Sequence, residues 1–476
     1  MEPAKFDFGM IGLGVMGSNL LLNMADHGFS VIGFDTNPDK TKALEASAGK
    51  DSSIKGDVKG VNTLKEMIAS LKTPRKLMML VPAGKPVDSV IGDLKPLLQK
   101  ADIIIDGGNS HYTDTLRRIN ELKNIGFHFM GMGISGGEEG ARKGPSIMPG
   151  GDEEAYKEVE PILKAVSAKV NGEPCVGYLG HDAAGHYVKM VHNGIEYAIM
   201  QLISECYDLM HNGLGLSNKE LHDVFKDWDG GDMKSFLLEI TEIIFDKKDD
   251  KTGNYLVDMI LDKAGAKGTG QWTSEEGLDL PMPIPTIDSA VMMRNLSGLI
   301  NERKEADSLY NTPLQKIKSD KKEFIAQLRE ALYFATLMSY AQGLAMLTTA
   351  STELKMDIPL PEVVSVWRGG CIIRSAMLDM FKKAYKNADL KNILLDKDIA
   401  KLVQQKESAI QKVVSIAVLN NYPAAGLTAS LNYFNAYRRK LLPTNLVQAQ
   451  RDFFGAHTYQ RIDVEGIFHT EWEEGK

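Results

Sequence analysis

The stretch "GMIGLGVMGSNLLLNMADHGFSVIGFD", residues 9–35, decides the fold of this chain. It holds Gly12, Gly14 and Gly17 in the spacing G-x-G-x-x-G, between a strand-like run and a helical pattern. Glycines at these places allow a tight turn and let the backbone approach a pyrophosphate at the positive end of the helix. Asp35 ends the next strand-like run, about 20 residues after the third glycine. The stretch predicts a βαβ unit that binds a dinucleotide; the alternative is that the glycines serve helix packing alone.

The residues around Asp35 bear on the choice of cofactor. A carboxylate there accepts hydrogen bonds from an unmodified adenosine ribose and repels a 2′-phosphate. The segment "FDTNPDK" places no arginine beside it, although Lys40 and Lys42 lie close enough to serve a phosphate in part. We therefore predict NAD as the cofactor, with NADP as the alternative.

Three parts follow one another along the chain. Residues 1–181 alternate strand-like runs with helical patterns, which predicts a Rossmann-like α/β domain with a parallel sheet. Its candidate strands are "FDFGMIG", "SVIGFD", "KLMMLV", "DIIIDGG", "HFMGMGI" and, as a sixth, "CVGYLG". Residues 182–440 have helical periodicity, including the long stretches 185–210 and 321–350, and predict a large all-α domain. Residues 441–476 form a C-terminal tail that is rich in aromatics and poor in periodicity.

Composition narrows the class of protein. The chain has 476 residues, 43% of them hydrophobic, and a net charge of −8, which is unlike a nucleic-acid binder. Three scattered cysteines are too few for a disulfide framework, and no Asp or His residues cluster at the spacing of metal ligands. The first residues lack the pattern of a signal peptide, and no apolar run approaches the ~18 residues that span a bilayer. We expect a cytoplasmic protein that binds neither nucleic acid, membrane nor metal.

The segment "HYVKMVHNGIEY", residues 186–197, carries an unusual polar stripe. As a helix it places Lys189, His192, Asn193 and Glu196 at i, i+3, i+4 and i+7 on one face, among apolar neighbours. An internal salt-bridge and hydrogen-bond network is one explanation. A catalytic stripe is the other, because two glycine-rich loops, "DGGNSHYTDT" and "MGISGGEEGARKGPSIMPGG", follow candidate strands upstream, where open α/β sheets bind ligands.

Seven segments carry a family resemblance that covers nearly the whole chain. They are "GLGVMGSN", "DGGNSHY", "GISGGEEGAR", "GPSIMPGG", "GHYVKMVHNGIEY", "AKGTGQWT" and "QAQRDFFGAHTY". Together they resemble the decarboxylating 6-phosphogluconate dehydrogenases, the long form in the pentose phosphate pathway. The resemblance implies oxidative decarboxylation of 6-phosphogluconate to ribulose 5-phosphate and CO2, with reduction of NAD or NADP and without a metal.

The resemblance also implies residue roles. Lys189 is the base that takes the proton of the substrate 3-hydroxyl, and Glu196 is the acid that protonates C1 of the enediol after CO2 leaves. A free lysine has a pKa near ~10.4, so burial or a positive neighbour must lower it. The implied substrate contacts are Asn109, Ser135, Gly136, Gly137, His192, Asn193, Tyr197, Lys267, Thr269, Arg294, Arg451 and His457. The implied cofactor contacts are Gly12, Leu13, Gly14, Val15, Met16, Gly17, Asp35, Thr36, Asn37, Val81, Pro82, Ala83 and Asn109.

Two features of the family affect the assembly and the cofactor. Its tail enters the other subunit and completes that active site, so a homodimer is implied, with Arg451 and His457 acting on the partner's substrate. Members that use NADP usually have Asn-Arg-Ser/Thr where this chain has Asp35, Thr36 and Asn37, and often a lysine where it has Pro82. Both departures remove positive charge and favour NAD.

Two other functions stay open at this point. A non-decarboxylating β-hydroxyacid dehydrogenase shares the sheet domain and the lysine helix, but that class is usually shorter and lacks the "KGTG" segment and the Arg and His of the tail. A non-catalytic NAD-binding protein would be expected to have lost Lys189, Glu196 or Asn109, and this chain keeps all three.

Overall fold

The structure is a computed structural model that describes residues 5–473. The chain divides into two compact units, of which the first ends at Ser430 and the second begins at Leu431. The first unit contains both the sheet and most of the helices. The predicted tail begins at residue 441, whereas the second unit begins within a helix that spans Ala425–Tyr437.

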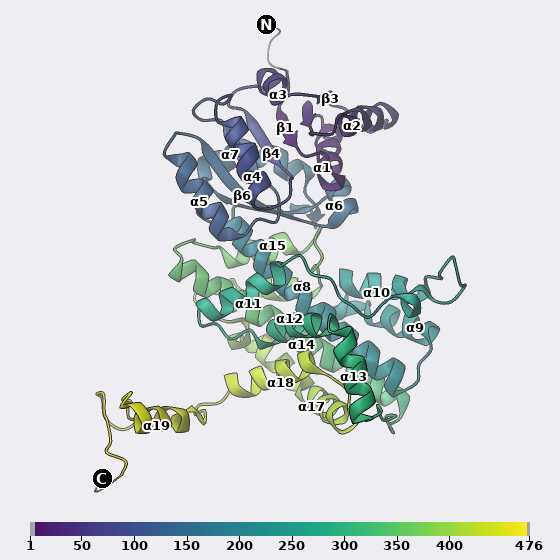
Figure 1. Cartoon of the computed structure of the whole chain (residues 1–476), viewed down its shortest axis with the longest axis vertical. Helices are drawn as coiled ribbons and strands as arrows, with labels where there is room; N and C mark the ends of the chain where they lie inside the picture. The colour runs from purple at the N-terminus through teal and green to yellow at the C-terminus, as the bar shows by residue number, and fades with distance from the viewer. Residues whose placement is uncertain (1–4, 474–476) are drawn as a thin grey trace. The chain divides into compact units, whose positions relative to one another are not determined.

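A seven-stranded sheet forms the first part of the chain, with helices on both of its faces (Figure 1). Its strands are β1 (Phe8–Ile11), β2 (Val31–Phe34), β3 (Val58–Val61), β4 (Lys76–Met79), β5 (Ile103–Asp106), β6 (His128–Ser135) and β7 (Ser146–Gly151). Their order is β3-β2-β1-β4-β5-β6-β7, and all pairs are parallel except β6 with β7. The order reverses between β1 and β4, which is where Rossmann-like sheets bind dinucleotides.

The helices of this part are α1 (Val15–Asp26), α2 (Pro38–Lys50), α3 (Leu64–Ser70), α4 (Lys85–Leu94), α5 (Tyr112–Lys123), α6 (Gly137–Lys143) and α7 (Glu153–Val166). A short hairpin of β8 (Lys169–Val170) and β9 (Glu173–Pro174) follows. Alternate residues along the strands pack into two hydrophobic cores, one on each face of the sheet. Ile103 and Ile105 of β5 join the core beneath α1 and α7, while Ile104 joins the core beneath α3, α4 and α5.

Two strand predictions need correction. "CVGYLG" is not a strand, since only Val176 forms an isolated bridge, to Ile147. The last strand of the seven-stranded sheet is instead β7, in the sequence "SIMPGG" that we interpreted as loop, and β3 was missed as well. Both missed strands lack the run of β-branched and aromatic residues that marks a strand, because they pair at the two edges of the sheet.

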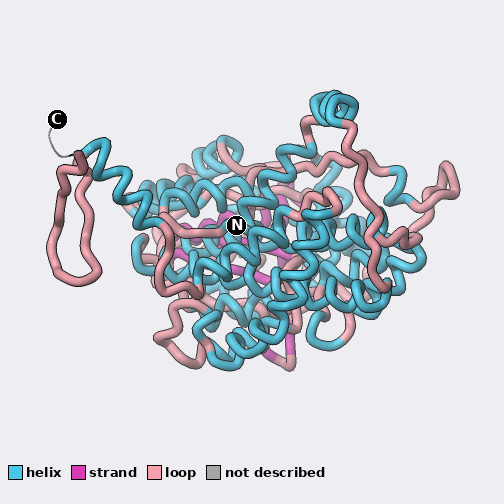
Figure 2. Tube along the Cα trace, turned by 90° about the horizontal axis from the view of Figure 1, so that it is seen from below, coloured by secondary structure: helices cyan, strands magenta, loops and turns pink. Residues whose placement is uncertain are grey.

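After residue 184 the first unit is helical (Figure 2). Its helices are α8 (Ala184–Asp208), α9 (Asn218–Trp228), α10 (Phe236–Asp246), α11 (Thr269–Asp279), α12 (Pro285–Ser297), α13 (Ile300–Tyr310), α14 (Lys321–Glu353), α15 (Leu360–Trp367), α16 (Met377–Ala384) and α17 (Lys397–Leu419). Helix α18 (Ala425–Tyr437) begins in the first unit and continues into the second. Short helical turns are η1 (Leu209–Gly213), η2 (Gly231–Met233), η3 (Leu256–Met259) and η4 (Ile393–Leu395). The two long helices that were predicted are α8 and α14, and both are buried along most of their length.

The second unit has more structure than its sequence pattern suggested. It contains α19 (Thr444–Gly455), followed by a segment in which Tyr459 and Phe468 form an antiparallel bridge. Asp452 of α19 is buried and accepts hydrogen bonds from His469 Nδ1 and Trp472 Nε1, each at 2.9 Å. The side chains of this unit therefore gather around one carboxylate, that of Asp452, and such an arrangement leaves no apolar periodicity in the sequence.

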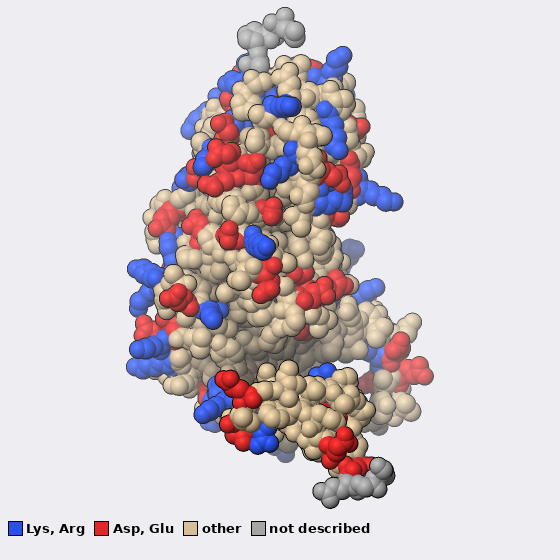
Figure 3. Space-filling model, turned by 90° about the vertical axis from the view of Figure 1, so that its left-hand side faces the viewer, with Lys and Arg blue, Asp and Glu red and all other residues tan. Residues whose placement is uncertain are grey.

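The surface carries mixed charge. On the face drawn in Figure 3, lysines and arginines are interspersed with aspartates and glutamates, and neither sign covers a large area. Within residues 5–473, no helix is both long enough and apolar enough to cross a bilayer.

Candidate active site

Glycine is suited to each of the three positions of the first loop for a different structural reason. Gly12 has φ +95°, a conformation that favours glycine. A Cβ on Gly17 would lie 2.0 Å from the Gly12 carbonyl oxygen, so this glycine permits α1 to pack on β1. A Cβ on Gly14, in contrast, would meet nothing within 4 Å. Gly14 also precedes the first residue of α1, so its open side is where a pyrophosphate fits against the helix N-terminus.

Asp35 lies at the end of β2, beside this loop, and is buried. Its Oδ2 accepts the Leu13 N–H at 2.8 Å and the Lys40 ammonium at 3.1 Å, and its Oδ1 accepts the Asn37 N–H at 2.9 Å. Burial alone would raise the pKa of Asp35, but these three donors outweigh it and lower the pKa. Asp35 is therefore a carboxylate at neutral pH, and Lys40 is its ion-pair partner.

The other predicted cofactor residues surround the same edge of the sheet. Val15 and Met16 open α1, and the segment Val81–Ala83 connects β4 to α4. Thr36 is exposed, while Asn37 caps α2 by accepting the Asp39 N–H. Asn109 is exposed in the loop between β5 and α5. These positions all follow the carboxyl ends of β1, β2, β4 or β5, where a dinucleotide binds in this type of sheet.

Helix α8 lies directly against the sheet, because glycines remove the side chains between them. A Cβ on Gly133 of β6 would lie 2.4 Å from the Lys189 Cβ. A Cβ on Gly150 of β7 would lie 2.2 Å from the Gly185 nitrogen, and one on Gly185 would lie 2.3 Å from the Gly131 oxygen. This close approach brings Lys189 to the end of the sheet where the cofactor residues lie.

The predicted polar stripe of α8 forms a connected cluster. Lys189 Nζ donates to Asn193 Oδ1 at 2.7 Å and lies 3.2 Å from His192 Nδ1. His192 Nε2 lies 3.3 Å from Ser135 Oγ, which connects the stripe to the end of β6. Gly136 and Gly137 follow Ser135 with φ +117° and +63° and start α6. The structure thus brings Ser135, Lys189, His192 and Asn193 together, as predicted.

Burial shifts the pKa values of the two proposed catalytic groups in opposite directions. It lowers the pKa of Lys189, an effect that Glu196 partly offsets. It raises the pKa of Glu196, against the opposing influence of Lys189 and Arg294. Glu196 Oε2 lies 3.9 Å from His192 Nδ1, and the two described groups Lys189 and Glu196 do not form an ion pair. A plain salt bridge between them is therefore excluded as the reason for the stripe.

His192 is neutral in this cluster, since burial, reinforced by Lys189, holds its pKa well below 6.5. When Lys189 carries its proton, Nδ1 of His192 accepts and Nε2 is left to donate to Ser135. The imidazole therefore orients groups without adding charge beside the lysine.

A second cluster lies further along α8. The Arg294 guanidinium carbon lies 3.4 Å above the Tyr197 ring, and Arg294 Nη1 donates to the Gly265 oxygen at 3.1 Å. A Cβ on Gly270, in the first turn of α11, would lie 2.4 Å from the Tyr197 ring. Thr269 is the first residue of this helix, and Lys267 is exposed just before it. Donors and cations that suit a phosphate are thus gathered here.

Arg451 and His457 lie in the second unit and stay predictions as site residues. Arg451 is on α19, where its Nη1 donates to Gln448 Oε1 at 3.1 Å. The His457 ring follows the helix and packs edge-on against Phe454, with ring centroids 5.8 Å apart.

One buried positioning residue was missed in the sequence. Arg118 of α5 is 1% exposed and donates to the Gly84 oxygen at 3.1 Å and to Ser110 Oγ at 3.4 Å. It therefore links the loop after β4 to the loop that carries Asn109. In the sequence it is one of two adjacent arginines on an amphipathic helix, which is typical of a solvent-exposed face.

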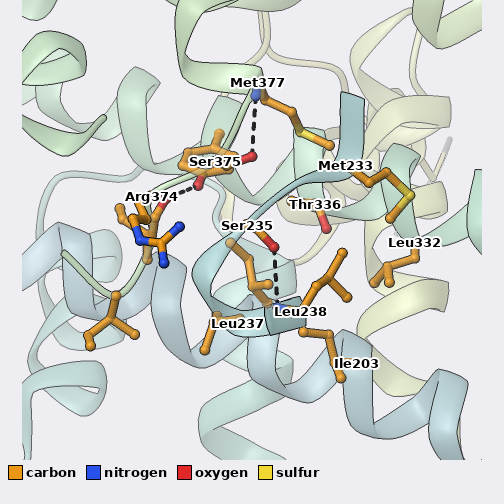
Figure 4. A pocket seen from close by; sticks show the side chains of 14 residues that line it. Ile203, Met233, Ser235, Leu237, Leu238, Leu332, Thr336, Arg374, Ser375 and Met377 are labelled. Atoms are coloured by element: carbon orange, nitrogen blue, oxygen red, sulfur yellow. Dashed lines mark hydrogen bonds between the residues drawn. The ribbon is translucent and has the colours of Figure 1, made fainter. Parts of the chain in front are cut away.

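A separate small cavity of about 20 Å³ lies in the helical part, and none of its lining residues is a predicted site residue (Figure 4). Its lining is mostly apolar and includes Ile203, Leu237 and Leu332. Ser235 Oγ and Ser375 Oγ on its wall already accept backbone N–H groups, from Leu238 and Met377. We interpret it as imperfect packing between α8, α10 and the segment before α16.

Comparison with known families agrees with this arrangement. The model described as "NAD binding domain of 6-phosphogluconate dehydrogenase" matches residues 7–180, and "6-phosphogluconate dehydrogenase, C-terminal domain" matches residues 185–472. The chain belongs to the 6-phosphogluconate dehydrogenase family.

Relatives in this family match over their full length. The chain is 50% identical to "6-phosphogluconate dehydrogenase, NADP(+)-dependent, decarboxylating" of Bacillus subtilis, over 98% of this chain and 99% of the relative. It is 48% identical to the decarboxylating 6-phosphogluconate dehydrogenase of Escherichia coli, with the same coverage. A solved 6-phosphogluconate dehydrogenase of Plasmodium falciparum, 44% identical, superimposes with a TM-score of 0.95 and covers 98% of this chain and 100% of its own.

Proposed function

We propose that this chain catalyses the oxidative decarboxylation of 6-phosphogluconate to ribulose 5-phosphate and CO2, and that it prefers NAD. The observation that carries the reaction is the buried stripe of α8, in which Lys189 has a lowered pKa and Glu196 a raised one. Relatives at 48–50% identity over the full length are named for this reaction.

The chain's own residues supply the proton transfers. Lys189, when neutral, accepts the proton of the substrate 3-hydroxyl; a bound nicotinamide would supply the acceptor for the hydride of C3. Breaking the C1–C2 bond then releases CO2 and leaves its electron pair on the ketone as an enolate. Protonated Lys189 donates to that oxygen, and Glu196 gives its proton to the carbon that lost CO2. Asn193 and His192 keep the lysine oriented throughout.

The two ends of the substrate have separate binding groups in this proposal. Ser135, Gly136 and Asn109 bind the carboxylate and hydroxyl end beside the cofactor, with short side chains that allow close approach. The Tyr197, Arg294, Thr269 and Lys267 cluster binds the phosphate. Arg451 and His457 of a second copy complete the phosphate site, so the active form is a homodimer that exchanges its tails.

The preference for NAD rests on Asp35. It is buried, ionised and next to the glycine loop, so a 2′-phosphate meets a fixed negative charge. Pro82, Thr36 and Asn37 add no positive charge. Lys40, which pairs with Asp35, favours the alternative, NADP, and the Bacillus subtilis relative is named NADP(+)-dependent.

The test measures kcat/KM for NAD and NADP at saturating 6-phosphogluconate, with CO2 release followed in parallel. With NAD as the cofactor, we expect NADH and CO2 to form together. We also expect kcat/KM to be about tenfold or more higher with NAD than with NADP, since one unfavourable charge contact costs roughly 1.4 kcal/mol or more. In Asp35→Asn the preference should shrink. Reduction without CO2 would contradict decarboxylation, while a preference for NADP would overturn only the cofactor assignment.

A further inference from the structure

A buried carboxylate, Glu276, connects three elements of the site. Glu276 lies on α11 and is 6% exposed. Its Oε2 accepts the Tyr112 hydroxyl at 2.7 Å, and its Oε1 accepts the Tyr187 hydroxyl at 3.3 Å. Tyr112 is the first residue of α5, in the sheet part, whereas Tyr187 is on α8. One side chain thus joins the sheet part to two helices of the helical part.

Each member of this trio lies near a proposed substrate contact in the sequence. Tyr112 comes three residues after Asn109, and Tyr187 comes two residues before Lys189. Glu276 lies two turns beyond Thr269 on the same helix. The trio therefore connects the segments that carry the cofactor end, the catalytic lysine and the phosphate end of the site.

Helices α8 and α11 form a rigid pair without the trio. Thr273 Oγ1 donates to the Met190 oxygen at 2.9 Å, and a Cβ on Gly194 would lie 2.6 Å from the Thr273 side chain. Such close packing leaves little room for sliding. Helix α5 also contacts α8 through Thr115 Oγ1 and His186 Nδ1, 2.7 Å apart. What Glu276 adds is the attachment of Tyr112, the first residue of α5 and the one nearest the Asn109 loop, to α11.

Aromatic contacts support the same attachment. The Tyr112 and Tyr187 rings meet edge-to-face at 4.9 Å, and the His111 ring meets Trp272 of α11 at 4.9 Å. Burial, together with Glu276, raises the pKa of both tyrosines, so their hydroxyls keep their protons and act as donors. A carboxylate removed from water depends on such donors.

We propose that Glu276 is a positioning residue that, through Tyr112 and Tyr187, holds the Asn109 loop at a fixed distance from Lys189 and Thr269. It touches neither the substrate nor the reacting atoms. The inference rests on the proposed function, in which Asn109 and Thr269 bind opposite ends of one substrate. A looser loop then lowers the fraction of bound substrate that is aligned for hydride transfer.

The test compares Tyr112→Phe, Glu276→Gln and the double variant. We expect each single variant to lower kcat/KM for 6-phosphogluconate about tenfold, the loss expected for a hydrogen bond to a charged group, with the loss in kcat rather than in KM for 6-phosphogluconate. The double variant should be no worse than the poorer single variant, because both remove one interaction. Tyr156→Phe is the matched control, since the Tyr156 hydroxyl donates to Glu160 at 3.2 Å within α7, away from the site.

Amide hydrogen exchange of residues 107–112 gives a readout that is independent of turnover. Faster exchange in Tyr112→Phe than in the wild type is expected, and unchanged exchange overturns the attachment. Faster exchange with kcat/KM within twofold of wild type would contradict a role in catalysis. If the fold losses in kcat/KM of the two single variants multiply in the double variant, Tyr112 and Glu276 act separately, which contradicts the proposal. A wild-type protein that does not turn over 6-phosphogluconate contradicts the proposed function instead, while the exchange result still decides the attachment.

Discussion

Lys189 and Glu196 are seven residues apart on one helix, and their surroundings shift their pKa values in opposite directions, as their proposed roles require. Burial destabilises the charged form of each, so it moves the lysine toward a base and the glutamate toward an acid. Their spacing lets them act on different carbons of an extended substrate. Burial alone thus moves both pKa values in the directions that the proposed roles require.

The pH dependence of kcat follows from these shifts. Turnover requires Lys189 without its proton and Glu196 with its proton, so kcat falls at both low and high pH. Burial lowers the pKa of Lys189 from 10.5 and raises that of Glu196 from 4.5, so the two values approach each other. Each unit of convergence enlarges the competent fraction of enzyme about tenfold. We expect a bell-shaped profile of kcat against pH, with both limbs between these ordinary values.

The variant Glu196→Gln should remove the fall of kcat at high pH and keep the fall at low pH. Without an ionisable acid, the remaining activity depends only on neutral Lys189, so it should rise with pH and then level off. Glu353→Gln, at the exposed end of α14, is the matched control and should keep the bell. A fall at high pH that persists in Glu196→Gln would show that another group carries the acid role.

Much of the site could be predicted at the residue scale because its chemistry is local in sequence. The stripe of α8 lies within one helix, whose periodicity places its residues on one face, and the glycine loop is a short motif between β1 and α1. Glu276 and Arg118 could not be found in this way. Glu276 has its partners 164 and 89 positions away, and no sequence pattern marks such a contact.

At the scale of elements, glycines determine how closely helices approach the sheet. At the start of α1, Gly17 faces the backbone of the loop and Gly14, just before the helix, faces open space, although both belong to one sequence motif. Their different surroundings separate the two explanations of the motif, packing and ligand binding. The structure supports both, at different positions.

Substitution of Gly17 and Gly14 by alanine should distinguish the packing role from the ligand-binding role. Gly17→Ala forces α1 away from Gly12 and should destabilise the fold by about 1–3 kcal/mol, seen as a lower thermal unfolding midpoint. Gly14→Ala should leave the midpoint unchanged but raise KM for the dinucleotide about tenfold or more, because a methyl group occupies the side of the pyrophosphate.

Gly49→Ala is the control for these two variants, since a Cβ on Gly49 in α2 also meets nothing within 4 Å. It should leave KM for the dinucleotide unchanged and should not lower the midpoint, because alanine favours a helix more than glycine does. If Gly14→Ala behaves like Gly49→Ala, the open side of Gly14 does not hold the cofactor.

Elements were predicted where the apolar pattern is strong and missed where it is weak. The five parallel strands β1, β2, β4, β5 and β6 have dense apolar runs because they are interior, with helices on both faces. Edge strand β7 contains Pro149 and two glycines, and its pairing with β6 comes from tertiary structure. Helix α19 was missed because Asp452, rather than an apolar stripe, is its buried residue.

At the scale of the whole molecule, the proposal requires two copies. The second unit is folded around Asp452 and carries exposed Phe453 and Phe454, as a segment that docks on another surface would. In the proposed homodimer, the Lys189 site of one copy is completed by Arg451 and His457 of the other.

Complementation between two inactive variants tests this exchange. Lys189→Met keeps its tail but has no base, and a chain that ends at residue 440 keeps its base but has no tail. Each alone should lose at least about a hundredfold in kcat, the contribution of a general base or of a bound charge. Co-expressed in equal amounts, half of the dimers are mixed and each has one complete site, so about a quarter of wild-type activity should return.

The matched mixture pairs the truncated chain with a Lys189→Met chain that also carries Arg451→Ala and His457→Ala. That mixture should stay inactive, because no tail with its basic residues is present. Activity that fails to return in the first mixture, with dimers confirmed by light scattering, would mean that each tail serves its own subunit.

The backbone contacts between α8 and the sheet also limit how this chain can be divided and recombined. Gly131, Gly150 and Gly185 meet with no side chain between them, so the boundary near residue 181 is not a junction between independent modules. A sheet domain from another protein could be joined there only if it offered the same bare backbone at the ends of its last two strands. A graft that keeps the proposed catalytic lysine must therefore also keep the glycines that face its helix.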